Sequence, residues 1–162
     1  MNEYVIKYIG AGVLLISAVL YGYTMIRRER VKVVEISSFC ELIKFIRDNI
    51  KYKMVTLPVI FSEYHGAYFE KIGFIEAIRN FGIKRAWAEF SWVMEKDEIA
   101  LIDSFVKNIG SGYRDDEIQL CEYTLERLED AIESKSSDLK NKEKIYRTIP
   151  LMLALSVMLI IL

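Results

Sequence analysis

Hydrophobic residues in the middle of the chain recur at alternating steps of three and four, the spacing of residues on one face of an α-helix. The first such stripe comprises Ile36, Phe39, Ile43, Ile46 and Ile50. It predicts an amphipathic helix that buries this face against other helices. Pro and Gly are scarce, at two and eight residues, which disfavours long loops and an all-β chain.

Further stripes of the same kind follow. Thr56-Leu57-Pro58 predicts the start of a short helix to about Tyr64, because Thr can cap a helix and Pro is tolerated in its first turn. The later stripes run from Phe69 to Phe81, from Ala86 to Val93, from Ile99 to Ile109 with Asp97 as its cap, and from Ile118 to Leu139. Together they predict an all-α fold, a bundle of six helices.

The two ends of the chain are apolar. Residues 9–26 carry no charge, and as a helix they would extend about 27 Å, close to the ~30 Å thickness of a bilayer core. Residues 148–162 are also uncharged, and would extend about 22 Å. We therefore expect a transmembrane helix at each end, with local thinning of the bilayer at the shorter one.

Basic residues lie on the inner flank of each apolar run. They are Arg27, Arg28, Arg30 and Lys32 after the first run, and Lys140, Lys142, Lys144 and Arg147 before the second. By the positive-inside rule, both groups predict a cytoplasmic middle. The expected organisation is a transmembrane segment at 1–26, a cytoplasmic helical bundle at 27–147 and a transmembrane segment at 148–162.

Charge and composition argue against nucleic-acid binding and against a conventional metal site. A net charge of -1 provides no general attraction for nucleic acid. His65 is the single histidine, and Cys40 and Cys121 lie within helical stripes rather than in a CxxC pair, so no conventional metal cluster is predicted. Both cysteines are expected to be buried free thiols. No cofactor and no catalytic residue is predicted.

Two groups of residues are candidates for binding a partner. Asp115, Asp116 and Glu117 are consecutive carboxylates at the predicted start of the last helix. They are explained either by the helix dipole, which favours negative charge there, or by a bound cation. Trp92 lies outside the helical spacing that makes Trp87 and Phe90 core candidates, which indicates an exposed docking residue.

Several local sequences match one family in order and spacing. They are Ile50-Lys51-Tyr52 with Leu57-Pro58, Gly82 with Ala86-Trp87, Gly110 and Gly112 leading to Asp115 and Gln119, and Lys144-Ile145-Tyr146-Arg147-Thr148. With these motifs the chain resembles the stage III sporulation protein AB family. That family is itself similar to one cytoplasmic repeat of the type II secretion inner-membrane platform family.

The resemblance implies a fold and a role. The fold is a secretion-platform-like cytoplasmic bundle, in which Pro58, Gly82, Trp87, Gly110, Gly112, Asp115, Gln119, Tyr146 and Arg147 are motif positions. The role is that of a non-catalytic platform in the mother-cell membrane facing the forespore. Its implied partners are the motor ATPase, stage III sporulation protein AA, and other membrane proteins of the same complex.

Two alternatives to the platform stay open at this point. One is a membrane-tethered enzyme that depends on a divalent cation held by Asp115, Asp116 and Glu117. The other is a tether whose copies associate with one another through the membrane segments, where Ala18 and Gly22 have the four-residue spacing that allows close helix contact. Self-association is compatible with the platform role as well.

Overall fold

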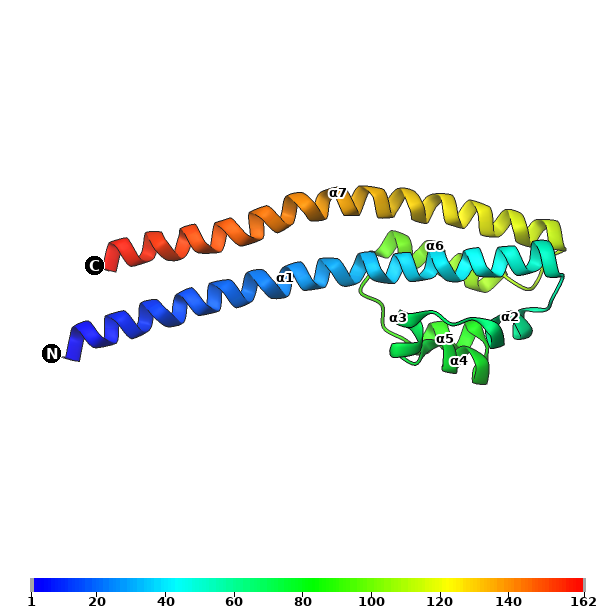
Figure 1. Ribbon diagram of the computed structural model, residues 1–162, viewed down its shortest axis with the longest axis horizontal. Coiled ribbons are helices and arrows are strands. Elements are labelled where there is room, and N and C mark those ends of the chain that lie inside the picture. The colour runs from blue at the N-terminus through cyan, green and yellow to red at the C-terminus, as the bar shows by residue number, and fades with distance from the viewer. Residues whose placement is uncertain (1, 162) are drawn as a thin grey trace. The chain divides into compact units, whose positions relative to one another are not determined.

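The computed structural model describes residues 2–161, apart from the side chains at positions 2–8, 11, 15, 144, 147, 154, 158, 160 and 161. Over these residues the chain forms seven α-helices, a short π-helix and no strand, which confirms the all-α class. In order they are α1 (Asn2–Asp48), the π-helix η1 (Asn49–Lys53), α2 (Leu57–Glu63), α3 (Ala67–Lys71), α4 (Phe74–Phe81), α5 (Ile83–Glu89), α6 (Lys96–Asn108) and α7 (Arg114–Ile161) (Figure 1).

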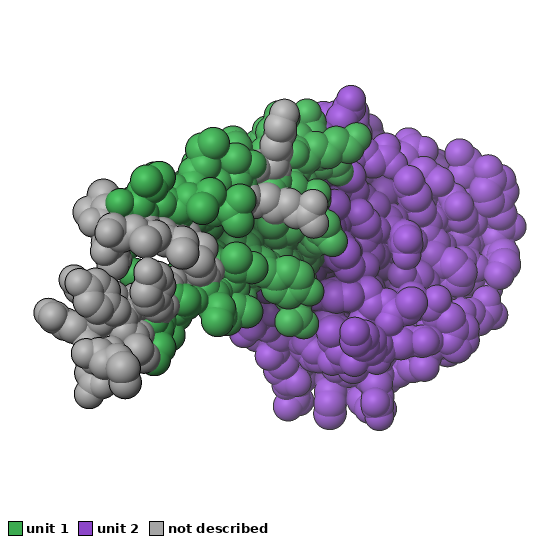
Figure 2. Space-filling model, turned by 60° about the vertical axis from the view of Figure 1, so that its left-hand side comes forward, with its two compact units in different colours: residues 1–31, 135–162 green, residues 32–134 purple. Residues whose placement is uncertain are grey.

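The chain divides into two compact units. Unit 1 consists of Met1–Val31 and Lys135–Leu162, and unit 2 of Lys32–Ser134 (Figure 2). The long helices α1 and α7 contribute residues to both units, whereas η1 and α2 to α6 belong to unit 2.

The core of unit 2 forms around the predicted stripe of α1. All five residues of that stripe are buried, none with more than 6% of its surface exposed. Phe39 lies edge-on to Phe69 and to Trp87, with ring centroids 4.8 and 5.4 Å apart. Leu125 and Leu128 of α7 belong to the same core, as their spacing predicts.

Two helix boundaries differ from the prediction. The single helix expected from Phe69 to Phe81 is two helices, α3 and α4, separated at Gly73, whose φ of 80° is left-handed. This backbone conformation ends a helix and is readily adopted by glycine. The helix expected from Ala86 to Val93 is α5, which ends at Glu89, so the chain from residue 90 to 95 is not helical.

Two predicted caps also differ. Thr56 is the N-cap residue of α2, but its side chain makes no capping hydrogen bond. The cap of α6 is Glu95 and not Asp97: the Glu95 side chain accepts a bond from the backbone N–H of Glu98, and the Glu98 side chain accepts one from the backbone N–H of Glu95. This reciprocal arrangement is a capping box with glutamate in the position usually held by Ser or Thr.

Unit 1 pairs the first part of α1 with the last part of α7. The helices lie close together at Gly22, where an added Cβ would lie 2.7 Å from the backbone oxygen of Tyr146. Ion pairs join the same two helices: Arg30 binds Glu143, and the Lys142 ammonium lies 3.4 Å from the Glu29 carboxylate. The small residue at position 22 therefore permits close packing, as its spacing indicates.

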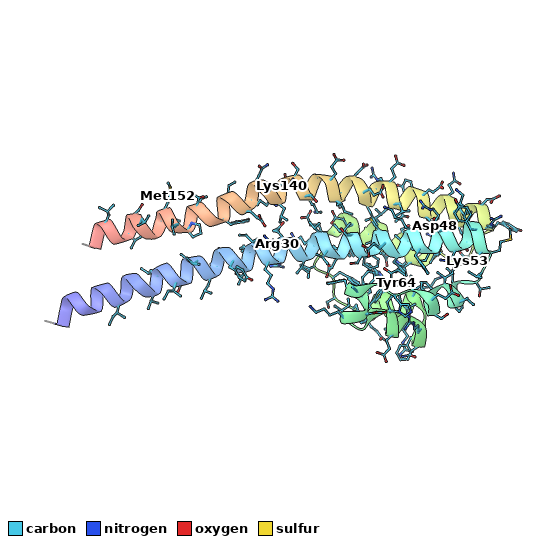
Figure 3. All side chains as sticks on the ribbon, in the orientation of Figure 1. Arg30, Asp48, Lys53, Tyr64, Lys140 and Met152 are labelled. Atoms are coloured by element: carbon cyan, nitrogen blue, oxygen red, sulfur yellow. The ribbon has the colours of Figure 1, made fainter. Side chains whose placement is uncertain are left out.

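Unit 1 exposes many large apolar side chains on both helices. They include Ile9, Val13, Leu14, Ile16, Val19 and Leu20 of α1, and Ile149, Leu151, Met152, Leu153, Leu155 and Leu159 of α7; Met152 is labelled in Figure 3. Across the described residues, no helix offers an apolar stretch long enough to cross a bilayer. The two membrane spans stay predictions.

Candidate functional site

Irregular backbone gathers where α1 ends in unit 2. The last turns of α1 continue as the π-helix η1, in which Lys53 is the final residue (Figure 3). Met54 follows in the left-handed region, with φ 54° and ψ 35°. Both π-helices and left-handed residues other than glycine are uncommon and concentrate at functional sites. This end of unit 2 is therefore a candidate binding surface.

Arg114, the first residue of α7, binds backbone carbonyls within η1. Its Nε donates a hydrogen bond to the backbone oxygen of Ile50 at 3.2 Å, and its Nη2 donates to that of Lys51. These carbonyls lack a partner at the end of a helix, and a cation is favoured there by the helix dipole. Arg114 thereby joins the start of α7 to η1, the continuation of α1.

Two adjoining pockets open at this end of unit 2. The first, which we call the α4–α5 pocket, has a volume of about 710 Å³ and is lined by Leu57, Pro58, Phe61, Ser62, Ile78, Arg79, Phe81, Gly82, Ile83, Lys84, Ile109 and Gly110. The second has a volume of about 480 Å³ and is lined by Ile50, Met54, Val55, Thr56, Leu57, Pro58, Gly110, Gly112, Arg114 and Glu117. Leu57, Pro58 and Gly110 form part of both walls.

Residues of the resemblance motifs converge on these pockets. Pro58 lies in the first turn of α2, Gly82 between α4 and α5, and Gly110 and Gly112 in the turn before α7. They are distant in sequence, yet all four line one or both pockets. Spacing along the chain could not show this, because it depends on how α2, α4 and the turn before α7 pack together.

Gly110 requires glycine for two reasons. Its φ of 82° lies in the left-handed region, and a Cβ on it would lie 2.7 Å from Cδ1 of Leu57. Gly82 also has a positive φ, 81°. Any larger residue at position 110 would strain the backbone and displace a pocket wall.

Cations dominate the charged residues of the α4–α5 pocket. Arg79 donates hydrogen bonds to the backbone oxygens of Phe61 and Tyr64, at 3.1 and 2.9 Å, so it caps the end of α2. Lys84 is exposed and has no ion pair within the described part of the chain. Among the described residues, no carboxylate lines this pocket. Its apolar wall is thus bordered by positive charge that no acidic side chain of the pocket balances.

The acidic group at the start of α7 adjoins the second pocket. Asp115 and Asp116 are exposed in the first turn of α7, whereas Glu117 is partly buried and lines the pocket. Their place in the first turn matches the favourable interaction with the helix dipole. Among the residues that the structure describes, no three His, Cys, Asp or Glu side chains are arranged to hold a metal ion.

Trp92 lies in an aromatic cluster and is only partly exposed, so the expected exposed position is wrong. Its indole stacks on that of Trp87, with centroids 4.9 Å apart, and contacts Phe39 and Phe74 edge-on at 5.0 Å each. The non-helical chain from residue 90 to 95 turns this side chain back onto the core. Trp87 is buried, as predicted, and its indole N–H donates to Asp103 at 3.1 Å.

The remaining predicted residues lie away from the pockets. Gln119 is exposed on α7, and Tyr146 is partly buried in unit 1, opposite Gly22. The Arg147 side chain lies outside the described residues. Cys40 and Cys121 are buried free thiols, as predicted, and burial raises the pKa of each to about 12. A thiol with so high a pKa is a poor nucleophile at neutral pH.

Comparison with known proteins identifies one family. The model of the family described as stage III sporulation protein AB matches residues 7–162. No significant match was found among curated proteins or among solved structures.

Proposed function

Because the chain belongs to the stage III sporulation protein AB family, and so takes part in stage III sporulation, we propose that it is a non-catalytic membrane platform that docks a cytoplasmic motor ATPase. One observation carries the proposal. Unit 1 exposes apolar side chains on both of its helices, whereas unit 2 has an apolar core of its own and charged side chains on its surface. Such a division suits an anchor and a docking module.

The anchor follows from the exposed side chains of unit 1. Patches of this kind are rare on a protein surface in water and mark contact with a membrane or a partner. The exposed residues named above for α1 and α7 all fall within the uncharged runs 9–26 and 148–162. With basic residues following the first run and preceding the second, the proposed orientation has unit 2 in the cytoplasm.

The docking surface for the motor is proposed at the start of α7. Asp115 and Asp116 are exposed there, and neither makes an ion pair within the described part of the chain. Exposed carboxylates attract a basic surface and raise the rate of association with it. The resemblance supplies the identity of the motor, stage III sporulation protein AA; the residues supply only the expected chemistry of its contact surface.

Flotation with liposomes tests this proposal. Liposomes that carry the full chain should bring the purified motor ATPase to the top of a density gradient. Asp115→Lys combined with Asp116→Lys should weaken this binding by about tenfold or more, since two attractive contacts become repulsive. Glu76→Lys combined with Asp97→Lys is the matched control, because both residues are exposed elsewhere on unit 2.

The results of this flotation experiment distinguish the docking surface on α7 from the platform role itself. Loss of the motor with the α7 variant but not with the control supports docking at Asp115 and Asp116. Equal binding by the wild-type chain and both variants contradicts this surface. A motor that never floats with the wild-type chain, at any lipid composition or nucleotide state, contradicts the platform itself.

A further inference from the structure

The α4–α5 pocket has the chemistry of a docking site for an acidic segment that carries an apolar side chain. Its wall is largely apolar, and Phe81, 54% exposed, extends that surface into solvent. Arg79 directs its guanidinium to carbonyl oxygens, and Lys84 has no ion pair in the described residues. A carboxylate from outside could therefore bind Lys84 without displacing an existing partner.

The same unit exposes a surface with the opposite properties, on the outer face of α7. Glu122, Glu126, Asp130 and Glu133 follow one another at steps of four, four and three, and all are exposed. We call these four residues the acidic stripe. Like charges four residues apart on a helix repel each other and destabilise it. Arg127 is the single basic residue between positions 115 and 134.

The stripe carries an exposed aromatic residue at its edge. Tyr123 is 56% exposed, and lies one residue after Glu122 and three before Glu126. The neighbouring Glu129 is paired with Lys44 at 2.6 Å, whereas none of the four stripe residues makes an ion pair within the described part of the chain. The stripe thus presents negative charge and an apolar ring together.

We propose that the α4–α5 pocket of one copy of this chain binds the acidic stripe of a second copy. Tyr123 of the second copy would contact the apolar wall near Phe81, and Glu126 or Asp130 would pair with Lys84. The pocket supplies positive charge and an apolar wall, and the stripe supplies negative charge and an aromatic ring. Such charge complementarity selects a partner and fixes its register. The contact extends the platform function, because it would join several copies into one assembly, and it does not depend on motor docking.

The two surfaces are different, so the contact is heterologous. A copy bound through its pocket still has a free stripe, and a copy bound through its stripe still has a free pocket. Contacts of this kind build rings or open chains rather than two-fold dimers. This property makes the proposal testable by mixing variants.

Energy transfer between donor-labelled and acceptor-labelled full chains in detergent measures the self-association. Lys84→Glu and Glu126→Lys should each weaken it by about tenfold or more, since each places like charges at the contact. Lys71→Glu and Glu76→Lys make the same charge changes at exposed positions outside both surfaces, and should leave the association unchanged. Far-ultraviolet circular dichroism of each variant verifies that it is folded.

Mixing the Lys84→Glu and Glu126→Lys chains tests the heterologous contact most directly. A Lys84→Glu chain keeps its stripe and a Glu126→Lys chain keeps its pocket, so an equal mixture should associate more strongly than either variant alone. A photocrosslinker at position 81 should then join that residue to a peptide containing Tyr123 of the other copy. The proposal is overturned if the wild-type chain does not associate up to about 100 μM, or if all variants associate equally. It is also overturned if the mixture of the two variants does not associate, or if position 81 crosslinks only to lipid or to another segment.

Discussion

The carboxylate of Glu35 accepts a hydrogen bond from the backbone N–H of Val93 at 2.8 Å, between residues 58 positions apart in the chain. The same oxygen accepts the N–H of Met94 at 3.2 Å, and the other oxygen accepts the hydroxyl of Tyr68 at 3.1 Å. Glu35 is 3% exposed. One buried side chain of α1 thus satisfies the backbone of the non-helical segment between α5 and α6.

Replacing Glu35 should therefore destabilise unit 2. In Glu35→Gln, the amide nitrogen cannot accept the hydrogen bonds that one carboxylate oxygen accepts, and we expect a loss of about 2 kcal/mol. Tyr68→Phe, which removes one donor, should cost about 1 kcal/mol. Urea unfolding of the full chain in detergent measures both. Glu41→Gln, at an exposed position of the same helix, is the control, and equal stability of Glu35→Gln and this control would contradict the role of Glu35.

Truncating a core residue of α7 should destabilise the chain more than replacing Glu35. Leu128 is fully buried, so Leu128→Ala should cost about 2–5 kcal/mol through lost burial and the cavity that remains. Gln119→Ala, exposed on the same helix, should change the stability by less than about 0.5 kcal/mol. Wild-type-like thermal unfolding of Leu128→Ala would place the wrong face of α7 in the core.

Gly73 is a matched control for Gly110, which lines both pockets. Both have a left-handed φ, but only at Gly110 would a Cβ meet another residue, Leu57. Gly73→Ala should cost about 1–2 kcal/mol from the backbone alone, and Gly110→Ala should cost more. Adding Leu57→Ala to Gly110→Ala should recover part of the extra stability lost at Gly110, because the clashing methyl group of Leu57 is gone. Equal costs for the two glycines, with no effect of Leu57→Ala, would contradict the close contact.

The buried cysteines predict a dependence on alkaline pH. Burial raises the pKa of Cys40 and Cys121 from 9.0 to about 12, with Glu129 and Glu117 respectively adding to the rise. The unfolded chain therefore loses these protons first, and the stability that each neutral thiol contributes should decline as the pH rises from about 9 towards 12. Replacing both cysteines by alanine should flatten this decline in unfolding measured from pH 8 to 11. An unchanged slope would contradict buried, neutral thiols.

Periodicity predicted most of the core and little of the site. The stripe of α1 is buried and those of α6 and α7 are largely buried, because each helix packs one face against the core. The spacing of residues such as Ile43 and Leu128 along the chain predicts these faces. The break at Gly73 was missed because the apolar pattern continues across it, and the position of a glycine alone does not reveal its φ. Trp92 was misplaced because the chain leaves the helix at Glu89, where no Pro or Gly marks the end.

The pockets and the Glu35 contacts depend on tertiary structure. Glu35 is a charged residue one position before the buried Ile36, and nothing near it in sequence shows that its hydrogen-bond donors lie on residues 68, 93 and 94. Pro58, Gly82 and Gly110 were identified as motif residues, but their common location needed the packed helices. The charges of Asp115 and Asp116 could be assigned to the start of a helix from sequence, because the helix dipole acts locally.

Membrane attachment of the full chain is the most direct test of the platform account. Membranes from sporulating cells would be washed with alkaline carbonate, and intact cells and inverted vesicles would be treated with protease. We predict that the chain stays in the carbonate pellet and that unit 2 is cleaved only in inverted vesicles. Release of the chain by carbonate, or cleavage of unit 2 from outside intact cells, would contradict an anchor formed by both apolar ends.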